Sequence, residues 1–362
     1  METPAGAPAK SALARAPFPG GFAKTAATIA RIELGSYPTP LERLGGLCRG
    51  AASLWVKRDD LTSPLYGGNK VRKLEYLLAD ARARGAKRLV TIGAVGSHHV
   101  LATAVFGARQ GFAVEAALVR QPRTDHAVEV LRAGLGQGLR AIPAGGYAGV
   151  VFSVLPRVLS RDAYFVTVGG SSQLGSMGYV DAARELAAQV RKGEMPEPDV
   201  VVVALGSGGT VAGLAAGLEL EGLKSKVLGV TVAEPPWFVA WRAHALARAC
   251  LRRAGGAARG GWLRDRLEVD GRWLGDGYGH ATVAGERATA VASPEGLVLD
   301  PTYTAKTFAA ALAEVEARSG AASPQTVLYW HTLSSAPAAP LLAEPGAVEE
   351  SALAPRVRSL FA

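Results

Sequence analysis

The chain has 362 residues, more than one hydrophobic core usually serves, so its length predicts two domains. Apolar residues make up 49% and charged residues 20% of the sequence, which excludes an intrinsically disordered protein. The formal net charge is +9, but the Lys and Arg residues are dispersed, without a cationic block or interleaved aromatic residues. We therefore expect no nucleic-acid partner.

Three further features bear on cellular location. No apolar run reaches the roughly 18 residues that span a bilayer, so we expect no membrane partner. The cysteines, Cys48 and Cys250, are too few for a disulfide framework, which indicates a cytoplasmic protein. Residues 1–30 are rich in Ala, Pro and Gly and lack an apolar signal core. They predict a disordered tail, with a transit peptide as the alternative.

The first predicted elements surround a glycine-rich break. A turn before a short helix is expected over 38–44, followed by a strand over 54–57. Residues 64–68 contain Pro and Gly and interrupt the chain. A helix then opens near Asn69 and runs to about Arg84, because its apolar residues recur at helical spacing.

Strands and helices alternate along the rest of the chain. Up to a proline-rich linker, strands are predicted over 89–92, 114–119, 139–142 and 163–168, and helices over 97–110, 125–135 and 176–190. Beyond it, strands are predicted over 199–205, 227–232 and 326–330, and helices over 211–220, 237–253, from about 286 and over 305–318. Residues 254–276 predict a mobile loop or a short hairpin. The alternation predicts parallel α/β sheets.

The helix that opens near Asn69 places a lysine in an unusual position. Asn69 suits an N-cap, because its side-chain oxygen can accept a free backbone N–H of the first turn. Lys70 then lies in that turn, where the positive end of the helix dipole favours the neutral amine. A neutral amine attacks carbonyl groups, so Lys70 is a candidate Schiff-base lysine. The alternative is that Lys70, Arg72 and Lys73 form a solvated helix start.

A second glycine-rich turn, Gly206-Ser207-Gly208-Gly209-Thr210, joins a buried strand to a helix. Its backbone N–H groups, its hydroxyls and the helix N-terminus can together bind a phosphate. The turn lacks the Gly-Lys-Ser/Thr ending of a Walker loop, and Val211 occupies the third glycine position of a dinucleotide fingerprint. The alternative is a tight turn without a ligand, and Lys70 upstream favours the phosphate.

A third turn, Gly93-Ala94-Val95-Gly96-Ser97-His98-His99, also joins a strand to a helix. Its free amides could bind a substrate carboxylate, and Ser97 is expected to face the same pocket. The alternative for the two histidines is an N-capping or partly buried polar pair. Tyr278 and Tyr303 are flanked by Gly or Pro, which favours loop positions over the ordinary core position of a tyrosine.

The run Lys57–Leu61 followed by Gly67–Glu75 resembles the D-cysteine desulfhydrase / 1-aminocyclopropane-1-carboxylate (ACC) deaminase family, and the similarity extends from about Pro38 to Ser335. The resemblance implies pyridoxal 5'-phosphate (PLP) as the cofactor. It also implies the two-domain α/β fold of tryptophan synthase β-like enzymes (fold type II), with open twisted sheets. A large PLP-binding domain of residues 31–73 and 179–362 would carry a small inserted α/β domain, residues 74–178. The cofactor then lies in the cleft between them.

The resemblance implies roles for individual residues. Lys70 would bond the PLP aldehyde, and catalytic roles fall on Lys70, Ser97, Tyr278 and Tyr303. His98 stands where the family usually has the Asn that hydrogen-bonds the 3'-oxygen of PLP; imidazole can donate there, but it is bulkier and titrates. The remaining cofactor contacts are assigned to Asn69, Gly206, Ser207, Gly208, Gly209, Thr210, Tyr303, Thr304 and Thr332. Substrate contacts are assigned to Ser97, His98, His99 and Tyr278, and no metal is expected.

Two hydroxyl residues discriminate between the branches of this family. The ACC-deaminase branch tends to have Glu at the position of Thr304 and Leu at the position of Thr332, whereas the desulfhydrase branch has hydroxyls at both. A hydroxyl near the pyridine nitrogen does not hold a proton there as a carboxylate does, so the ring is a weaker electron sink. That suffices for loss of a good leaving group. The segment 333–335 departs from the family's usual glycines.

The resemblance therefore implies a lyase or deaminase. We expect D-cysteine, or a relative such as β-chloro-D-alanine, to lose its α-proton to Lys70 and to yield pyruvate and ammonia, with hydrogen sulfide from D-cysteine. Ser97 and Tyr278 would position the substrate or assist proton transfer. The alternatives are an ACC deaminase, a β-replacement synthase and a non-catalytic amino-acid-binding relative. We expect a cytoplasmic homodimer.

Overall fold

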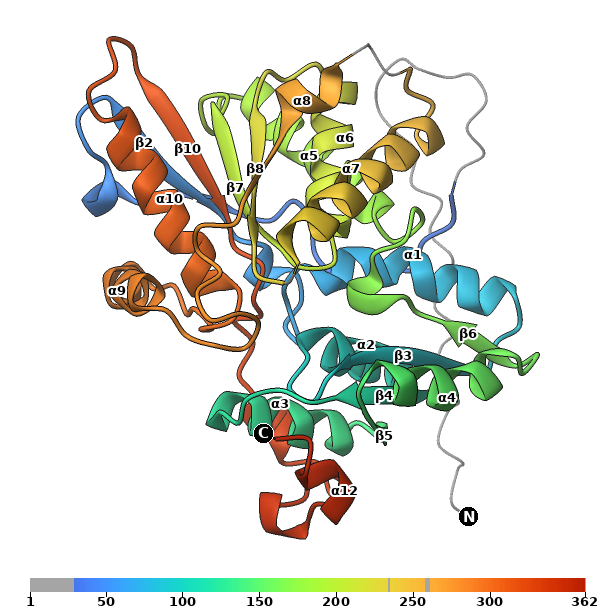
Figure 1. Ribbon diagram of the computed structural model, residues 1–362. Coiled ribbons are helices and arrows are strands. Elements are labelled where there is room, and N and C mark those ends of the chain that lie inside the picture. The colour runs from blue at the N-terminus through green and yellow to red at the C-terminus, as the bar shows by residue number, and fades with distance from the viewer. Residues whose placement is uncertain (1–28, 234, 258–260, 362) are drawn as a thin grey trace, which may run out of the picture.

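The computed structural model describes residues 29–233, 235–257 and 261–361, so most of the predicted tail lies outside the described residues. The chain forms two separate sheets (Figure 1). The six-stranded sheet has the order β1 (Leu41–Arg43), β2 (Ala52–Lys57), β10 (Gln325–Trp330), β7 (Val200–Leu205), β8 (Lys226–Thr231) and β9 (Leu267–Asp270). The four-stranded sheet has the order β5 (Arg140–Gly145), β4 (Ala113–Val119), β3 (Arg88–Ala94) and β6 (Ala163–Phe165).

All strand pairs are parallel except β1 with β2. Helices cover both faces of the larger sheet (Figure 1). One face packs against α5 (Met177–Arg191), α6 (Gly209–Glu221) and α7 (Pro236–Arg253), and the other against α9 (Val283–Ala292) and α10 (Thr304–Arg318). Both faces of β7 are therefore covered, which is why all six of its residues are apolar and buried.

The smaller sheet is covered in the same way. On one face lie α1 (Lys70–Ala83), α2 (His98–Arg109) and α3 (Asp125–Gly136), and on the other α4 (Tyr147–Val158). Helix α1 contacts both α2 and α5, so it connects the two halves of the molecule. None of the helices in the described part of the chain is long and apolar enough to cross a lipid bilayer.

The predicted alternation of strands and helices is confirmed, with three local corrections. Residues 38–44 contain the edge strand β1, which was not predicted, and the expected short helix follows as a 3-10 helix over Gly45–Leu47. Helix α4 was not predicted, because apolar side chains in the helix and at its C-cap are exposed and blur the helical pattern; these are Val151, Phe152, Leu155 and the C-cap Leu159. The expected loop or hairpin over 254–276 instead contains α8 (Trp262–Arg266) and β9. A parallel edge strand of four residues pairs only with a distant strand, so local sequence carries little signal for it.

The C-terminal segment returns to the smaller sheet. Its short helices α11 (Ala339–Leu342) and α12 (Pro355–Arg358) carry Leu341 and Val357 into the apolar core of α2 and α3. The Gln121 N–H donates to the Leu360 carbonyl at 3.1 Å. Our proposed domain boundaries, 73/74 and 178/179, place the whole smaller sheet within the inserted segment, and the C-terminal residues pack back onto it.

Candidate active site

A cavity of about 700 Å³ opens where the carboxyl ends of strands from both sheets meet. Its wall combines the turns that precede α1, α2 and α6 with part of α7 and the loop that precedes α10. The predicted site residues that line it are Asn69, Lys70, Ser97, His98, His99, Gly206, Ser207, Gly208, Thr210, Tyr278, Tyr303, Thr304 and Thr332. The remaining one, Gly209, lies in the same turn as Gly208. The fold thus brings together residues that are more than 250 positions apart in sequence.

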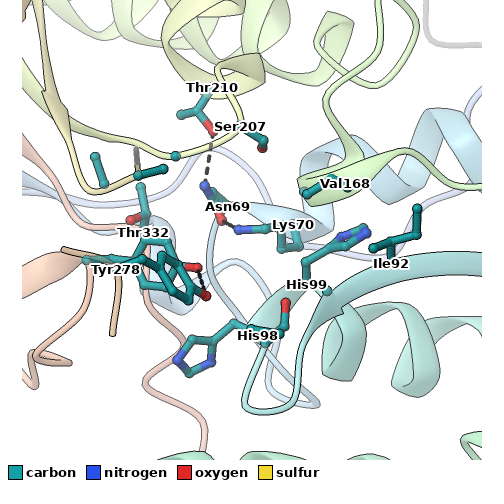
Figure 2. Close-up of a pocket in the computed structure, with 18 of the residues that line it drawn as sticks. Asn69, Lys70, Ile92, His98, His99, Val168, Ser207, Thr210, Tyr278 and Thr332 are labelled. Atoms are coloured by element: carbon teal, nitrogen blue, oxygen red, sulfur yellow. Dashed lines mark hydrogen bonds between the residues drawn. The ribbon is translucent and has the colours of Figure 1, made fainter. Parts of the chain in front are cut away.

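Lys70 is the first residue of α1, and its amine is held towards the glycine turn (Figure 2). The Nζ atom donates to Asn69 Oδ1 at 2.6 Å, and Asn69 Nδ2 donates to Thr210 Oγ1 at 3.0 Å. Burial lowers the pKa of Lys70 to about 8, although Asp300 opposes this shift. About a tenth of the amine is therefore neutral at pH 7, far more than for a lysine with the ordinary pKa.

The predicted capping role of the Asn69 side chain is wrong. Asn69 does occupy the N-cap position, but its side chain makes no capping hydrogen bond. Its backbone is helical (φ −67°, ψ −12°), whereas a capping side chain needs extended backbone at this position. The amide instead bridges Lys70 and Thr210, which links the lysine to the glycine turn.

The glycine turn between β7 and α6 offers several donors to the cavity. Gly208 has φ +92°, a left-handed conformation that favours glycine. Within the described chain, the N–H groups of Ser207, Gly208 and Thr210 have no hydrogen-bond acceptor, while Gly209 N–H donates to Ser171 Oγ at 3.0 Å. Buried or semi-buried N–H groups normally find an acceptor, so an anion fits this turn.

Lys73 and Ser171 lie beside this turn, and neither was predicted as a site residue. Lys73 Nζ donates to Gly169 O at 3.1 Å and to Ser171 Oγ at 3.2 Å, and Ser171 Oγ lies 2.7 Å from Ser207 Oγ. Burial lowers the pKa of Lys73 well below its usual value, and the nearby Lys70 and Arg242 lower it further.

The alternative of a solvated helix start is wrong, because Arg72 and Lys73 are only 3% and 2% exposed. The position of Lys73 in the sequence could have predicted that its side chain faces the cavity. Residues three apart on a helix share a face, and Lys73 follows Lys70 by three.

The turn between β3 and α2 provides a second group of free donors. The N–H groups of His98, His99 and Val100 have no acceptor among the residues that the structure describes. Ser97 is 7% exposed and lines the cavity beside them. This helix N-terminus therefore suits a carboxylate, in agreement with the chemistry expected from the sequence.

The two histidines of this turn have different environments. His99 is buried, and its Nε2 lies 2.8 Å from Thr91 Oγ1, which in turn donates to the Val166 carbonyl at 2.8 Å. The proton of His99 is therefore on Nε2. His98 is half-buried, and in Figure 2 its ring points away from Lys70. Its Nδ1 lies 2.5 Å from Tyr66 Oη, and its Nε2 lies 3.0 Å from Nε2 of His126.

The two predicted tyrosines reach the cavity from different loops: Tyr278 lies between β9 and α9, and Tyr303 directly precedes α10. The loop before α10 also carries a carboxylate, Asp300, that was not predicted as a site residue. The hydroxyls of Tyr278 and Tyr303 lie 2.6 Å apart (Figure 2), and burial raises the pKa of Tyr278 to about 12. Asp300 lines the cavity but accepts hydrogen bonds from the N–H groups of residues 302–304. It also accepts from the Thr304 hydroxyl at 2.7 Å. An Asp at a helix start is the local signal for this arrangement.

The segment 332–335 is hydrogen-bonded to the loop before α1. The Thr332 carbonyl accepts from Asn69 N–H at 3.1 Å. Ser334 Oγ accepts from Gly67 N–H at 2.8 Å, and Ser335 Oγ donates to Asp60 at 2.5 Å. The serines that depart from the family's glycines therefore form structural hydrogen bonds, and they hold Thr332 beside Asn69.

This combination of fold and site defines a class of enzyme: two α/β sheets with an activated lysine beside an anion-binding turn. Residues 32–332 match the family model described as "Pyridoxal-phosphate dependent enzyme", and the chain belongs to that family. Its cofactor is accordingly PLP. The Lys70 amine fits the cofactor's aldehyde, and the unpaired N–H groups of the glycine turn fit its phosphate.

Individual relatives narrow the comparison. The chain is 38% identical over 291 residues to a D-cysteine desulfhydrase from Salmonella paratyphi B, covering 77% of this chain and 86% of that protein. It is 34% identical over 288 residues to a Pyrococcus furiosus protein provisionally named 1-aminocyclopropane-1-carboxylate deaminase, covering 77% and 84%. The crystal structure of an ACC deaminase homologue superposes with a TM-score of 0.72 at 27% identity, covering 84% of this chain and 92% of that one.

Proposed function

We propose that this enzyme removes the β-substituent of a small amino acid, with D-cysteine as the main substrate and pyruvate, ammonia and hydrogen sulfide as products. The observation that carries the proposal is the Lys70 amine, which faces the cavity between a phosphate-type turn and a carboxylate-type turn. The similarity to a D-cysteine desulfhydrase supports the choice of substrate.

Bound PLP supplies an electron sink for the carbanion that forms when the α-proton leaves. The protein holds the cofactor's phosphate through the N–H groups of Ser207, Gly208 and Thr210 and through Lys73. Lys70 takes the α-proton at its Nζ atom, because its lowered pKa keeps part of the amine neutral.

The substrate is oriented from the opposite wall of the cavity. The N–H groups of His98 and His99 bind its carboxylate, and the Ser97 hydroxyl contacts the same end of the molecule. The paired hydroxyls of Tyr278 and Tyr303 lie over the remaining side and limit access of water.

The hydrogen bonds around Thr304 and Thr332 favour elimination over ring opening. The Thr304 hydroxyl donates to Asp300, and the Asp300 carboxylate is already saturated by the backbone of the loop. Neither group is free to hold a proton on a pyridine nitrogen. The Thr332 hydroxyl has no partner among the described residues and is the group available for that contact. A weaker electron sink suits the departure of hydrosulfide.

The experiment compares products from different substrates with the same preparation of enzyme. We expect pyruvate and sulfide from D-cysteine and only traces of 2-oxobutyrate from ACC. The double variant Thr304→Glu, Thr332→Leu should shift this ratio towards ACC. Release of 2-oxobutyrate as the main activity of the wild type would instead make the protein an ACC deaminase, the alternative that the Pyrococcus relative favours.

Two further outcomes are informative. Thioether products formed with added thiols would indicate a β-replacement synthase. Bound PLP without turnover of any tested amino acid would indicate a non-catalytic binding protein. Neither outcome is expected, because Lys70 and the donors of both turns are all in place.

We also propose a cytoplasmic homodimer. Helix α4 and its C-cap residue expose Val151, Phe152, Leu155 and Leu159, and Phe152 is 80% exposed. A contiguous apolar helix face of this kind is a common protein–protein contact. Light scattering should give twice the chain mass of 37.4 kDa, and Phe152→Asp should shift the protein towards the monomer.

A further inference from the structure

Three aromatic side chains connect the cavity to the protein surface. Tyr66 lines the cavity and is 7% exposed, His98 is half-buried, and His126, on the first turn of α3, is exposed. The Tyr66 hydroxyl lies 2.5 Å from His98 Nδ1, and His98 Nε2 lies 3.0 Å from His126 Nε2. These contacts form one continuous hydrogen-bonded series.

The direction of the hydrogen bonds follows from the chemistry of the groups. Burial raises the pKa of Tyr66 above its usual value, so the phenol keeps its proton and donates to His98 Nδ1. Burial lowers the pKa of His98 to about 4, so its ring is neutral at neutral pH and carries its proton on Nε2. That proton is donated to Nε2 of His126, whose own proton is then on Nδ1, towards solvent.

Other titratable groups surround the series on every side. Lys70 and Asp300 act on His98 in opposite directions, since the cation lowers its pKa and the carboxylate raises it. The Tyr303 ring approaches His98 edge-on at 6.3 Å between centroids. Near His126, Arg123 is paired with Asp125 at 3.2 Å and with Glu350 at 2.9 Å. Arg123 therefore already pairs with the carboxylates of Asp125 and Glu350.

We propose that Tyr66, His98 and His126 form a proton path between the active-site cavity and solvent. In the outward step, Tyr66 Oη accepts a proton from the cavity as its own proton passes to His98 Nδ1. His98 then passes its Nε2 proton to His126 Nε2, and His126 releases its Nδ1 proton to water. One proton leaves, and both rings end in the opposite tautomer.

The inward step reverses each transfer and restores the first tautomers. Water protonates His126 Nδ1, the Nε2 proton of His126 returns to His98, and the Nδ1 proton of His98 returns to Tyr66, which protonates a group in the cavity. The outward and inward steps supply the two proton transfers that the proposed elimination needs, so this link to catalysis rests on the proposed function. One proton leaves Cα, and one proton joins Cβ as the enamine becomes the imine that water hydrolyses to pyruvate. His126 is a positioning and relay residue, since it does not touch substrate or cofactor.

The first test does not require turnover. Nitrogen-15 NMR of histidine-labelled protein reports the tautomer of each ring, and assignment uses His98→Gln and His126→Gln. We expect His98 as the Nε2–H tautomer and His126 as the Nδ1–H tautomer, with the His98 signals altered by His126→Ala. Two rings that titrate independently, with the same tautomer, would overturn the proposal.

The second test separates proton transfer from structure. His126→Gln keeps a hydrogen-bond acceptor for His98 but cannot pass a proton on, and we expect kcat to fall about tenfold with KM unchanged. Imidazole added to His126→Ala should restore kcat in proportion to its concentration. Glu129→Gln is the matched control, because Glu129 is exposed on the same helix one turn away, and it should retain wild-type kcat.

The two tests separate failure of the path from failure of the proposed function. A wild-type protein that turns over no amino acid would remove the proposed function, and the NMR tautomers would still decide the path. An active wild type with full kcat in His126→Gln, and no response of His126→Ala to imidazole, would overturn the path alone.

Discussion

Helix α1 separates two polar regions that differ in how completely their charges are paired. On one side, Arg72 donates to Asp59 at 2.7 Å and to Glu185 at 2.9 Å, and Lys57 lies 2.6 Å from Glu185. On the other side, Lys70 and Lys73 face the cavity, where they contact only neutral oxygens in the structure.

The difference teaches how to tell a structural cluster from a binding site. Burial alone would raise the pKa of Glu185, but Arg72 and Lys57 hold it at about 2, so this cluster is closed and its charges offset one another. Burial lowers the pKa values of the two lysines on the cavity side, and no carboxylate of the described residues forms an ion pair with either lysine that would offset this shift. An open region of this kind becomes favourable only when it receives an anionic ligand, here the cofactor.

The largest expected effect is a loss of turnover when Lys70, on the cavity side of α1, is replaced. Lys70→Ala removes the amine that bonds the cofactor, and turnover of D-cysteine should fall by at least about 10³-fold. The visible absorbance of lysine-bound PLP should disappear, while the melting temperature of the apoprotein changes little. If the absorbance band and the turnover persist in this variant, another lysine bonds the cofactor, and Lys73 is then the first candidate.

A substitution in the paired cluster of Arg72, Asp59, Glu185 and Lys57 should lower the stability of the fold. Arg72→Met leaves the buried Asp59 without its cation and leaves Glu185 with Lys57 alone, and we expect the free energy of unfolding to drop by about 3–5 kcal/mol. Urea denaturation followed by circular dichroism measures this. The control is Arg191→Met, whose exposed ion pair with Glu221 should contribute less than about 1 kcal/mol. Equal losses in both variants would remove the distinction between closed and exposed pairs.

Lys73 sharpens the comparison, because it is buried but belongs to the open side. Lys73→Met removes an amine donor from the anion site, so we expect PLP to bind about tenfold to a hundredfold more weakly. Apoprotein stability should be retained, since the buried Lys73 amine has no carboxylate partner among the described residues. Fluorescence titration with PLP measures the affinity, and the exposed Lys192→Met is the control. An unchanged affinity of Lys73→Met for PLP would show that Lys73 does not contact the cofactor's phosphate.

The smallest expected effect is a pH dependence. Burial lowers the pKa of Lys70 to about 8, so the amine loses its proton as pH rises through that value. The rate at which apoprotein captures PLP should rise about tenfold between pH 7 and pH 9 and then level off. Stopped-flow absorbance gives this profile. A midpoint near the ordinary lysine value of about 10.5 would show that the amine is not desolvated.

The sequence was sufficient for the alternating fold, and it predicted many of the residues that line the cavity, because those residues occupy turns with recognisable chemistry. Lys70 and the glycine turn carry local signals that need no tertiary information. Three features depend on distant contacts and were missed. Lys73 is recognised only beside Ser171, the β9 strand only beside β8, and the His98–His126 contact only when α2 and α3 pack together.

The proposed chemistry requires the Lys70 amine to bond the cofactor, and one measurement identifies the lysine that does so. Borohydride reduction of the PLP-loaded enzyme fixes the cofactor to its lysine, and peptide mass spectrometry then locates the added mass. We predict the modification on Lys70, with Lys73 unmodified. Modification of Lys73, or a protein that gains no mass on reduction, would contradict the account.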